Sequence, residues 1–347
     1  MPTGHRFSRR TFLRAATTAA GSGLVLAGCG QGIGSGGQVP LAYWNFFTGG
    51  DGERMVGLVE AYRAEAPAVD VTDTTLMWGA PYYTKLAMAC AGGRAPDLAT
   101  LHASRLPTFG SDLLDEWDLD ELAARGVRPE EFPRPVLERV TIDGRLMALP
   151  LDTHPLVLYY NTDICEKAGL LAPDGTLAAI RGAEQMLDAG RRAAEVTGVN
   201  GIAFGAADNL ASWMVFWSLF RQLGGTMELP DGGPAQVDRD AMVEAMGYLY
   251  DMCDGTIASQ TLSGGDPAAS FASEQAGFLM IGPWEVTTAL TAGIPFSMTQ
   301  FPALFGDTPY VRADSHSFVL PTQASVDPAA RSAAYDMAVS MVRNSLD

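Results

Sequence analysis

The sequence predicts an α/β protein with two lobes that have separate cores. Strand-like and helix-like apolar patterns alternate along the chain, which is typical of helices packed on sheets. The chain has 347 residues, and a chain of this length usually folds around two hydrophobic cores instead of one. The following paragraphs take the expected elements in chain order.

The first alternation of strands and helices predicts a parallel sheet. Apolar and β-branched runs predict strands at residues 41–44, 69–76 and 95–101. Helices are expected from Glu53 to the Ala66-Pro67 break and over residues 82–91. Ligands of such sheets bind at the carboxyl ends of the strands. The polar and aromatic residues of the loops at those ends are Asn45, Asp51, Trp78, His102, Ser104 and Arg105.

A glycine-rich segment, residues 49–52, is expected to be part of the first of these loops. Such a loop could also suggest phosphate binding. It lacks the Lys-Ser/Thr pair of a P-loop and the GxGxxG spacing, so this alternative is weak.

The stretch from residue 149 to residue 170 has the most informative pattern of the chain. An apolar run is interrupted by Asp152, Thr153 and His154 and then resumes as a strand at residues 156–160. A helix start follows at residues 161–163. Asp152 and His154 are two residues apart, so on an extended segment they face the same side. They form either a satisfied polar pair at a strand end or contacts to a ligand.

The second half of the chain continues the α/β pattern. Helices are expected at residues 183–196, 210–223, 238–253 and 329–342, and strands at 201–205, 275–281 and 317–321. Trp213, near a helix start, is expected in a cleft, whereas Trp217 fits the core. Trp284 and Glu285 follow the buried strand at 275–281 after Gly282-Pro283, and Pro283 fits the first turn of a helix.

Several motifs resemble one protein family. Residues 143–170, DGRLMALPLDTHPLVLYYNTDICEKAGL, resemble the segment that crosses between lobes in bacterial extracellular solute-binding proteins of the sugar-binding, maltose-binding-protein-like class. GGDGE, AGGRAPDLATLHASRLP and AGFLMIGPW resemble further motifs of that family. The resemblance implies a periplasmic-binding-protein-like (type II) fold, in which a hinge joins two lobes and the ligand cleft lies between them.

The resemblance also predicts lobe boundaries. Residues 41–152 and 317–347 would form the first lobe, and residues 153–316 the second. Family members usually continue for several dozen residues more, so we expect the C-terminal part of the second lobe to be missing from this chain.

The function that the resemblance implies is capture of a sugar or oligosaccharide for delivery to the permease subunits of an ABC-type importer. Hinge closure would trap the ligand without making or breaking a bond, so we do not expect an enzyme. We also expect a monomer without a cofactor. The candidate ligand-binding residues are Asn45, Asp51, Trp78, His102, Arg105, Asp152, His154, Trp213, Trp284, Glu285 and His316.

Two alternatives belong to other functional classes. An exported carbohydrate-active enzyme, such as a glycoside hydrolase, could use the paired carboxylates Asp152 and Glu285. A metal-binding transport protein could use His102, His154 and His316, since imidazoles suit zinc. These histidines come from separate segments without HxxH or HxH spacing, which disfavours a metal site.

The N-terminus predicts export. SRRTFLR carries the Arg9-Arg10 pair of a twin-arginine signal, and an apolar segment leads to Leu26-Ala27-Gly28-Cys29, which resembles a lipoprotein cleavage site. Residues 1–28 would be the signal peptide, Cys29 the lipidated residue and residues 29–40 a flexible tether. The protein would then lie on the outer face of the cytoplasmic membrane, held only by its lipid.

Charge and cysteine content agree with this location. The leader contains four of the 23 basic residues and none of the 40 acidic ones, so its removal changes the formal net charge from −17 to −21. Such a surface repels nucleic acid and anionic lipid. Cys90, Cys165 and Cys253 show no metal-ligand spacing, and their apolar-periodic positions predict buried free thiols.

Overall fold

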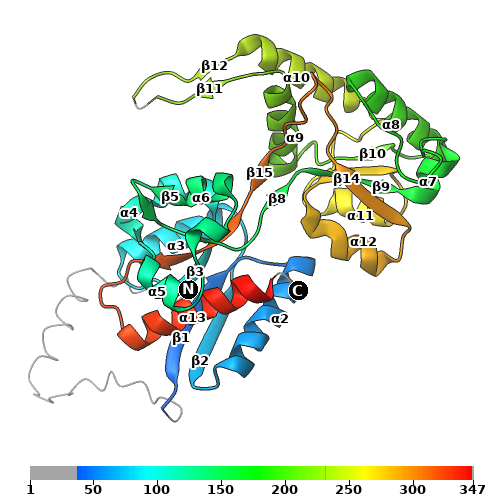
Figure 1. The fold of residues 1–347 in the computed structure, drawn as a ribbon. Coiled ribbons are helices and arrows are strands. Elements are labelled where there is room, and N and C mark those ends of the chain that lie inside the picture. Colours follow the sequence, from blue (N-terminus) through cyan, green and yellow to red (C-terminus); the bar gives the residue numbers. More distant parts are fainter. Residues whose placement is uncertain (1–36, 231, 346–347) are drawn as a thin grey trace, which may run out of the picture. The chain divides into compact units, whose positions relative to one another are not determined.

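The computed structural model describes residues 37–230 and 232–345. Its strands form two main sheets, one of six strands and one of four (Figure 1). We call the elements around the six-stranded sheet the first lobe and those around the four-stranded sheet the second lobe. The predicted signal peptide, Cys29 and most of the predicted tether lie outside the described residues. The two-lobed α/β architecture agrees with the type II fold expected above.

The first sheet has the strand order β2-β1-β3-β16-β4, and β7 also pairs with β16. Its strands are β1 (Val39–Asn45), β2 (Val69–Thr75), β3 (Leu98–His102), β4 (Leu114–Asp115), β7 (Leu149–Pro150) and β16 (His316–Pro321). β1 runs parallel to β2 and β3, so the predicted parallel βαβαβ order is confirmed. β16 is antiparallel to each of its neighbours, because the chain enters this sheet again from the second lobe.

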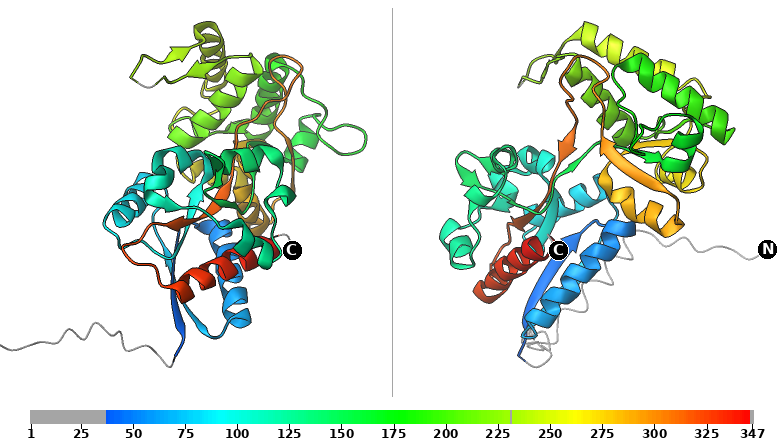
Figure 2. Two further views of the ribbon diagram at one scale, coloured as in Figure 1. Left: turned by 60° about the vertical axis from the view of Figure 1, so that its left-hand side comes forward. Right: turned by 45° about the vertical axis from the view of Figure 1, so that its right-hand side comes forward.

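The helices of the first lobe are α2 (Gly49–Glu65), α3 (Ala80–Ala91), α4 (Leu106–Leu113), α5 (Leu119–Ala124), α6 (Arg134–Val140) and α13 (Pro328–Asn344). Single 3₁₀ turns lie at Ala103–Arg105 and Pro129–Glu131, and a small hairpin pairs β5 (Thr141–Ile142) with β6 (Arg145–Leu146). α13 packs against β1 and α2 (Figure 2).

Two predicted boundaries in the first lobe are wrong for local reasons. α2 begins at Gly49, so the glycine-rich segment forms the first helical turn and not a loop; the Gly52 N–H donates to the Thr48 carbonyl and closes this turn. Gly49 has a φ of +60°, which glycine adopts at little cost. β3 begins at Leu98 and not at residue 95, because the Asp97 carboxylate accepts the Ala42 N–H that a strand carbonyl would otherwise take.

The second sheet has the strand order β10-β13-β9-β14. Its strands are β9 (Val157–Asn161), β10 (Ile202–Ala203), β13 (Phe278–Ile281) and β14 (Phe296–Gln300). Its helices are α7 (Thr162–Lys167), α8 (Ala183–Thr197), α9 (Asn209–Gln222), α10 (Arg239–Met252), α11 (Asp266–Ala272) and α12 (Val286–Ala292), with a 3₁₀ turn at Pro283–Glu285. A hairpin of β11 (Met227–Glu228) and β12 (Gln236–Val237) precedes α10.

Two chain segments connect the sheets side by side. β8 (His154–Pro155) leads from β7 toward β9, and β15 (Ala313–Asp314) leads from the second lobe back toward β16. β8 and β15 pair in antiparallel fashion, with Asp314 opposite His154. The two crossings of the chain are therefore neighbours, and the polar residues on each come together.

Each lobe has its own apolar core. One cluster joins buried residues of the first lobe, including Tyr43, Leu101 and Phe318. Two other clusters contain only residues of the second lobe, such as Phe220 and Phe278. Trp217 packs partly buried against the second-lobe core. Within the described residues, no helix is both long and apolar enough to cross a lipid bilayer.

The described cysteines are free, as expected from their positions. Cys90 and Cys165 are buried, whereas Cys253 is only partly buried. Burial raises the pKa of all three thiols, and for Cys165 to about 12. A thiolate is the reactive form of cysteine, so these side chains are inert.

Candidate functional site

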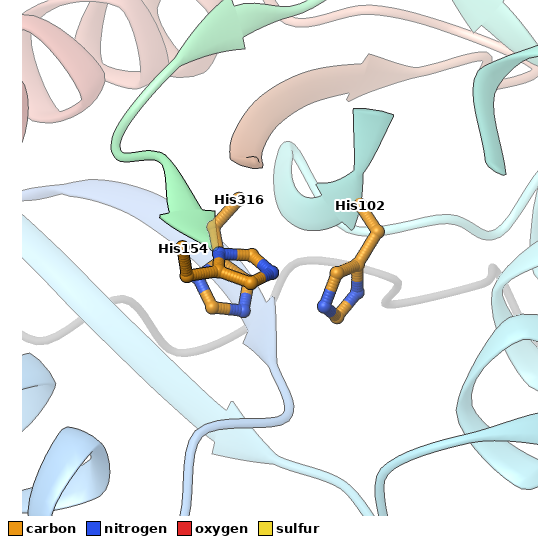
Figure 3. A group of neighbouring side chains, drawn as sticks. All are labelled: His102, His154 and His316. Carbon is orange, nitrogen blue, oxygen red and sulfur yellow. The ribbon is translucent and has the colours of Figure 1, made fainter. Parts of the chain in front are cut away.

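Strand pairing brings three histidines from distant segments to one point. His102 ends β3 and His316 begins β16, and the antiparallel register places them opposite each other. The register of β8 and β15 places His154 opposite Asp314, two residues before His316. Each histidine offers a ring nitrogen within 4.8 Å of those of the other two (Figure 3). All three side chains are buried.

The Asp152 carboxylate holds two of these imidazoles. Its Oδ1 accepts a hydrogen bond from His154 Nδ1 at 3.1 Å, and its Oδ2 accepts one from His316 Nδ1 at 2.6 Å. The His316 backbone N–H also donates to Oδ1, at 2.8 Å. Asp152 therefore determines which nitrogen of each ring faces away from it.

Tyr83, on α3, is the hydrogen-bond partner of Nδ1 in the third histidine, His102. Its hydroxyl lies 2.6 Å from His102 Nδ1. The Arg105 guanidinium lies over the Tyr83 ring, 4.9 Å from the ring centroid. In all three histidines Nδ1 is engaged, so Nε2 is the ring nitrogen for which no hydrogen bond is present among the described residues.

Burial and hydrogen bonding set the charges of the cluster. Burial lowers the pKa of His102 well below its ordinary value, and the nearby His316 lowers it further, so His102 is neutral near pH 7. Burial alone would raise the pKa of Asp152. The hydrogen bonds from His154 and His316 outweigh this and hold the pKa well below its usual range. The site thus combines an ionised carboxylate with a neutral imidazole.

Aromatic rings from both lobes surround the imidazoles. Phe46 stacks on His102 with centroids 4.9 Å apart, and Phe47 meets His316 edge-on at 4.6 Å. From the second lobe, Trp284 meets His154 edge-on at 5.7 Å. The Trp284 side chain is half-buried, so part of its ring stays accessible. The cluster has an apolar wall on the first-lobe side and an aromatic edge on the second-lobe side.

Asp51, in the first turn of α2, belongs to the same electrostatic environment. Burial raises the pKa of its carboxyl, the charge of His316 lowers it and the charge of Asp152 raises it again. Among the candidates, Asp51, His102, Asp152, His154, Trp284 and His316 are therefore brought together.

The other candidates have different surroundings. Asn45 is buried and donates from Nδ2 to Asp73 Oδ1 at 2.7 Å, while its Oδ1 accepts the Phe47 N–H at 3.0 Å, so it shapes the turn after β1. Glu285 accepts a hydrogen bond from the Thr288 hydroxyl on its own helical segment.

Two aromatic candidates are exposed. Trp78 is 44% exposed and Trp213 is 42% exposed, the latter stacking on Trp217 with centroids 5.3 Å apart. No hydrogen bond or ring contact within residues 37–230 and 232–345 joins either ring to the histidine cluster.

Sequence reasoning missed Tyr83 and the role of Asp314. The buried Asp314 carboxylate accepts hydrogen bonds from the Ser104 hydroxyl at 2.6 Å and from Arg312 at 2.8 Å, which ties β15 to the turn after β3. The contact between Ser104 and Asp314 spans 210 residues and depends on how the chain returns to β16, so no spacing in the sequence indicates it.

Comparison with known proteins identifies the class. The two-lobed fold is that of type II periplasmic binding proteins. The chain belongs to the bacterial extracellular solute-binding proteins, whose family model matches residues 48–339.

Curated relatives include an arabinooligosaccharide-binding protein of Bacillus subtilis (strain 168), 26% identical over 237 residues that cover 66% of this chain and 51% of that protein. The protein of the same name from Halalkalibacterium halodurans is 21% identical over 67% of this chain and 50% of its own length. The chain thus matches about half the length of these relatives.

Solved structures share the fold at low identity. The GacH receptor of Streptomyces glaucescens, solved unliganded and with acarbose, superposes with a TM-score of 0.72 and 20% identity, covering 88% of this chain and 76% of that one. The maltose/maltodextrin-binding domain MalE of Bdellovibrio bacteriovorus, bound to maltotriose, gives a TM-score of 0.69 and 16% identity over 88% of this chain and 76% of that one.

Proposed function

We propose that this protein binds a sugar or oligosaccharide between its two lobes and delivers it to an ABC-type importer. The observation that carries the proposal is the arrangement of Trp284 beside the polar groups of the crossing segments. A sugar ring presents C–H groups that pack on an aromatic face and hydroxyls that need hydrogen-bonding partners. Trp284 offers the first, and Asp152 offers the second.

Gly282 makes the position of the Trp284 ring possible. A Cβ built on Gly282 would overlap ring carbons of Trp284, so the indole lies directly over the glycine backbone. The absence of a side chain at residue 282 leaves room for the ring in this orientation. An aromatic platform needs such a fixed orientation to bind without ordering a mobile side chain.

Asp152 fits the role of hydrogen-bond acceptor. Its side chain is 40% exposed although both oxygens already accept hydrogen bonds from histidines. Carboxylate oxygens have about four acceptor positions, so capacity remains for a sugar hydroxyl. Hydrogen bonds to a charged acceptor are the stronger kind. Asp51 would contribute a second carboxylate from the first lobe, and Trp213 and Glu285 remain proposed contacts from the second.

The relatives favour an oligosaccharide as the ligand class. Curated relatives are named for arabinooligosaccharide binding, and structures of similar fold hold acarbose or maltotriose. Ligand that touches both lobes would stabilise a closed arrangement by hinge motion at the paired crossings β8 and β15. We place the lobe boundaries at these crossings, close to the expected boundaries after residues 152 and 316.

Glycoside hydrolysis is the less favoured function. A general acid must hold a proton near neutral pH, so its pKa has to be raised. The pKa of Asp152 is instead held well below its usual range. Asp152 is therefore unsuited to donate a proton to a leaving sugar.

A ligand screen tests the proposal. Thermal-shift measurements on the purified protein against arabino-, xylo- and malto-oligosaccharides should reveal a ligand, because binding only to the native state raises apparent stability. Calorimetry with that ligand then compares Trp284→Ala with Trp284→Phe. Loss of base stacking on an aromatic is worth about 1–3 kcal/mol, and we expect a similar loss for alanine and a smaller one for phenylalanine. Equal affinity of wild type and both variants would contradict an aromatic platform, and released monosaccharide would indicate an enzyme.

Export and anchoring complete the proposal. The Arg9-Arg10 pair and the Leu26–Cys29 segment support twin-arginine export and lipidation of Cys29, with the protein working as a monomer. Changing both arginines to lysine should leave precursor in the cytoplasm. Cys29→Ser should release the exported protein from membranes on fractionation, and continued sedimentation with membranes would refute the anchor.

A further inference from the structure

The histidine cluster has the chemistry of a metal site. We propose that His102, His154 and His316 bind one Zn²⁺ ion through their Nε2 atoms. Three imidazoles whose nitrogens lie within 4.8 Å of one another form a set of borderline ligands, the kind that zinc prefers. This site shares Asp152 with the proposed sugar site, but it differs in chemistry, because it needs neither an aromatic platform nor a hydroxyl-bearing ligand.

The first argument is the direction of the rings. Asp152 takes Nδ1 of two histidines and Tyr83 takes Nδ1 of the third. Zinc-bound histidines almost always donate their second ring N–H to a carboxylate, carbonyl or water, which orients the ring. A carboxylate that holds two ligands at once gives this cluster the outer contacts of a zinc site.

The second argument is that the Nε2 atoms have no hydrogen-bond partner in the part of the chain that the structure describes. No hydrogen bond to them is present within residues 37–230 and 232–345. The fully buried side-chain nitrogen and oxygen atoms without a partner in this part of the chain belong to Tyr248, Ser317 and Thr322. None is a histidine nitrogen, so the Nε2 atoms are not sealed from solvent although the three side chains are buried.

The third argument is charge. The Asp152 carboxylate supplies a negative charge in direct contact with two rings. Asp51 adds a second carboxyl within electrostatic reach.

The geometry needs only a small adjustment. Zinc–nitrogen distances of 2.0–2.1 Å imply tetrahedral nitrogen separations of about 3.4 Å. Ring nitrogens that lie within 4.8 Å of one another therefore have to approach by at most about 1.4 Å, shared between two side chains. Three protein ligands leave a fourth position for water or for an oxygen atom of a bound solute.

Direct metal titration tests the site. The purified protein, stripped with a chelator and without added sugar, is titrated with Zn²⁺ and with Co²⁺, and bound metal is counted by mass spectrometry. We expect one Zn²⁺ per chain and the visible absorption of nitrogen-ligated tetrahedral Co²⁺. Mg²⁺ should not compete, because it prefers oxygen ligands.

Variants assign the ligands. His102→Ala, His154→Ala and His316→Ala should each weaken Zn²⁺ binding at least tenfold, and Asp152→Asn should weaken it about 10–100-fold, as expected for loss of an orienting partner. The matched control replaces exposed carboxylates elsewhere, Glu184→Gln with Asp188→Asn on α8, and should bind Zn²⁺ as the wild type does.

Two results would overturn the proposal. One is equal Zn²⁺ uptake by the wild type and by a folded triple-histidine variant, which would assign the metal to surface carboxylates. The other is a wild-type protein that shows neither stoichiometric Zn²⁺ nor the Co²⁺ spectrum. The second result stands even if the histidine variants fail to fold, and sugar binding measured beside it reports separately on the proposed function.

Discussion

A single methyl group at residue 50 should hold the two lobes apart. Gly50 lies in the first turn of α2 in the first lobe, and this helix contacts α12 of the second lobe. A Cβ added at Gly50 would lie 2.5 Å from Thr287 Oγ1 and 3.0 Å from its Cγ2, and closer still to its Cβ. Because Cβ is held by the backbone, no rotamer of Thr287 removes the overlap. Gly50→Ala therefore requires α2 and α12 to separate.

The size of the effect follows from the overlap. Ordinary contacts to a Cβ begin at 3.4 Å, so the helices must move by about 1 Å or bear the strain. Overpacking of this kind costs about 1–3 kcal/mol, which weakens ligand binding about 5- to 150-fold if the ligand requires the lobes to close. The ligand-free protein escapes the strain by opening. It should keep its stability or gain about 0.4–1 kcal/mol from the lower entropy of its unfolded chain.

The assay compares two substitutions on one helix. Gly57 lies on α2 as well, is exposed and has nothing within 4 Å of a built Cβ, so Gly57→Ala changes helix propensity without the overlap. Calorimetry with the ligand found by screening should show wild-type affinity for Gly57→Ala and weakened affinity for Gly50→Ala. Melting temperatures without ligand should not fall in either variant. If Gly50→Ala binds as tightly as Gly57→Ala, the contact between α2 and α12 plays no part in ligand capture.

Three further substitutions or measurements test other contacts. Gly282→Ala should displace the Trp284 ring and reduce sugar affinity nearly as much as loss of the ring, with an unchanged far-UV spectrum; unchanged affinity in calorimetry would refute the packing of the ring over residue 282. The Cys165 thiol, whose pKa burial raises to about 12, should resist iodoacetamide near neutral pH and react only in denaturant, and rapid labelling of native protein followed by mass spectrometry would contradict its burial. Burial raises the pKa of Asp73, although the hydrogen bond from Asn45 lowers it in part. The free energy of unfolding therefore decreases as pH rises from the ordinary aspartate pKa through the raised one. Asp73→Asn should therefore raise the melting temperature near neutral pH but not below the ordinary aspartate pKa, and a gain of equal size at both pH values would refute the cause.

Sequence patterns were sufficient for the parts of the fold that depend on local periodicity. The parallel order of β1, β2 and β3 followed from alternating apolar patterns, and the strand and helix after His154 lie within one residue of their expected starts. The first turn of α2 was misread because glycine disfavours helices, whereas the closure of that turn by Gly52 and Thr48 could not be inferred from propensity.

The histidine cluster shows why the candidate site was harder to predict. His102, His154 and His316 were regarded as an improbable metal site because no short spacing joins them. Their proximity depends on the registers of β16 with β3 and of β15 with β8, which join residues far apart in the chain. A shift of one residue would turn His316 to the opposite face of the sheet. Register is a property of the packed sheet, so the metal interpretation could only be judged from the structure.

The position of β16 in the first sheet has a consequence for folding kinetics. β16 pairs with β3, β4 and β7, yet it is synthesised only after every strand of the second lobe. The edge of β3 therefore stays unpaired until then. Contacts between residues so far apart in sequence form slowly, because the entropy of closing the loop is lost before the contacts stabilise the chain. The second lobe, whose strands lie between residues 157 and 300, has all of its sheet available earlier. We therefore expect the second lobe to fold first during synthesis, with insertion of β16 as the slow step that joins the sheet of the first lobe and, in the same event, assembles the three histidines.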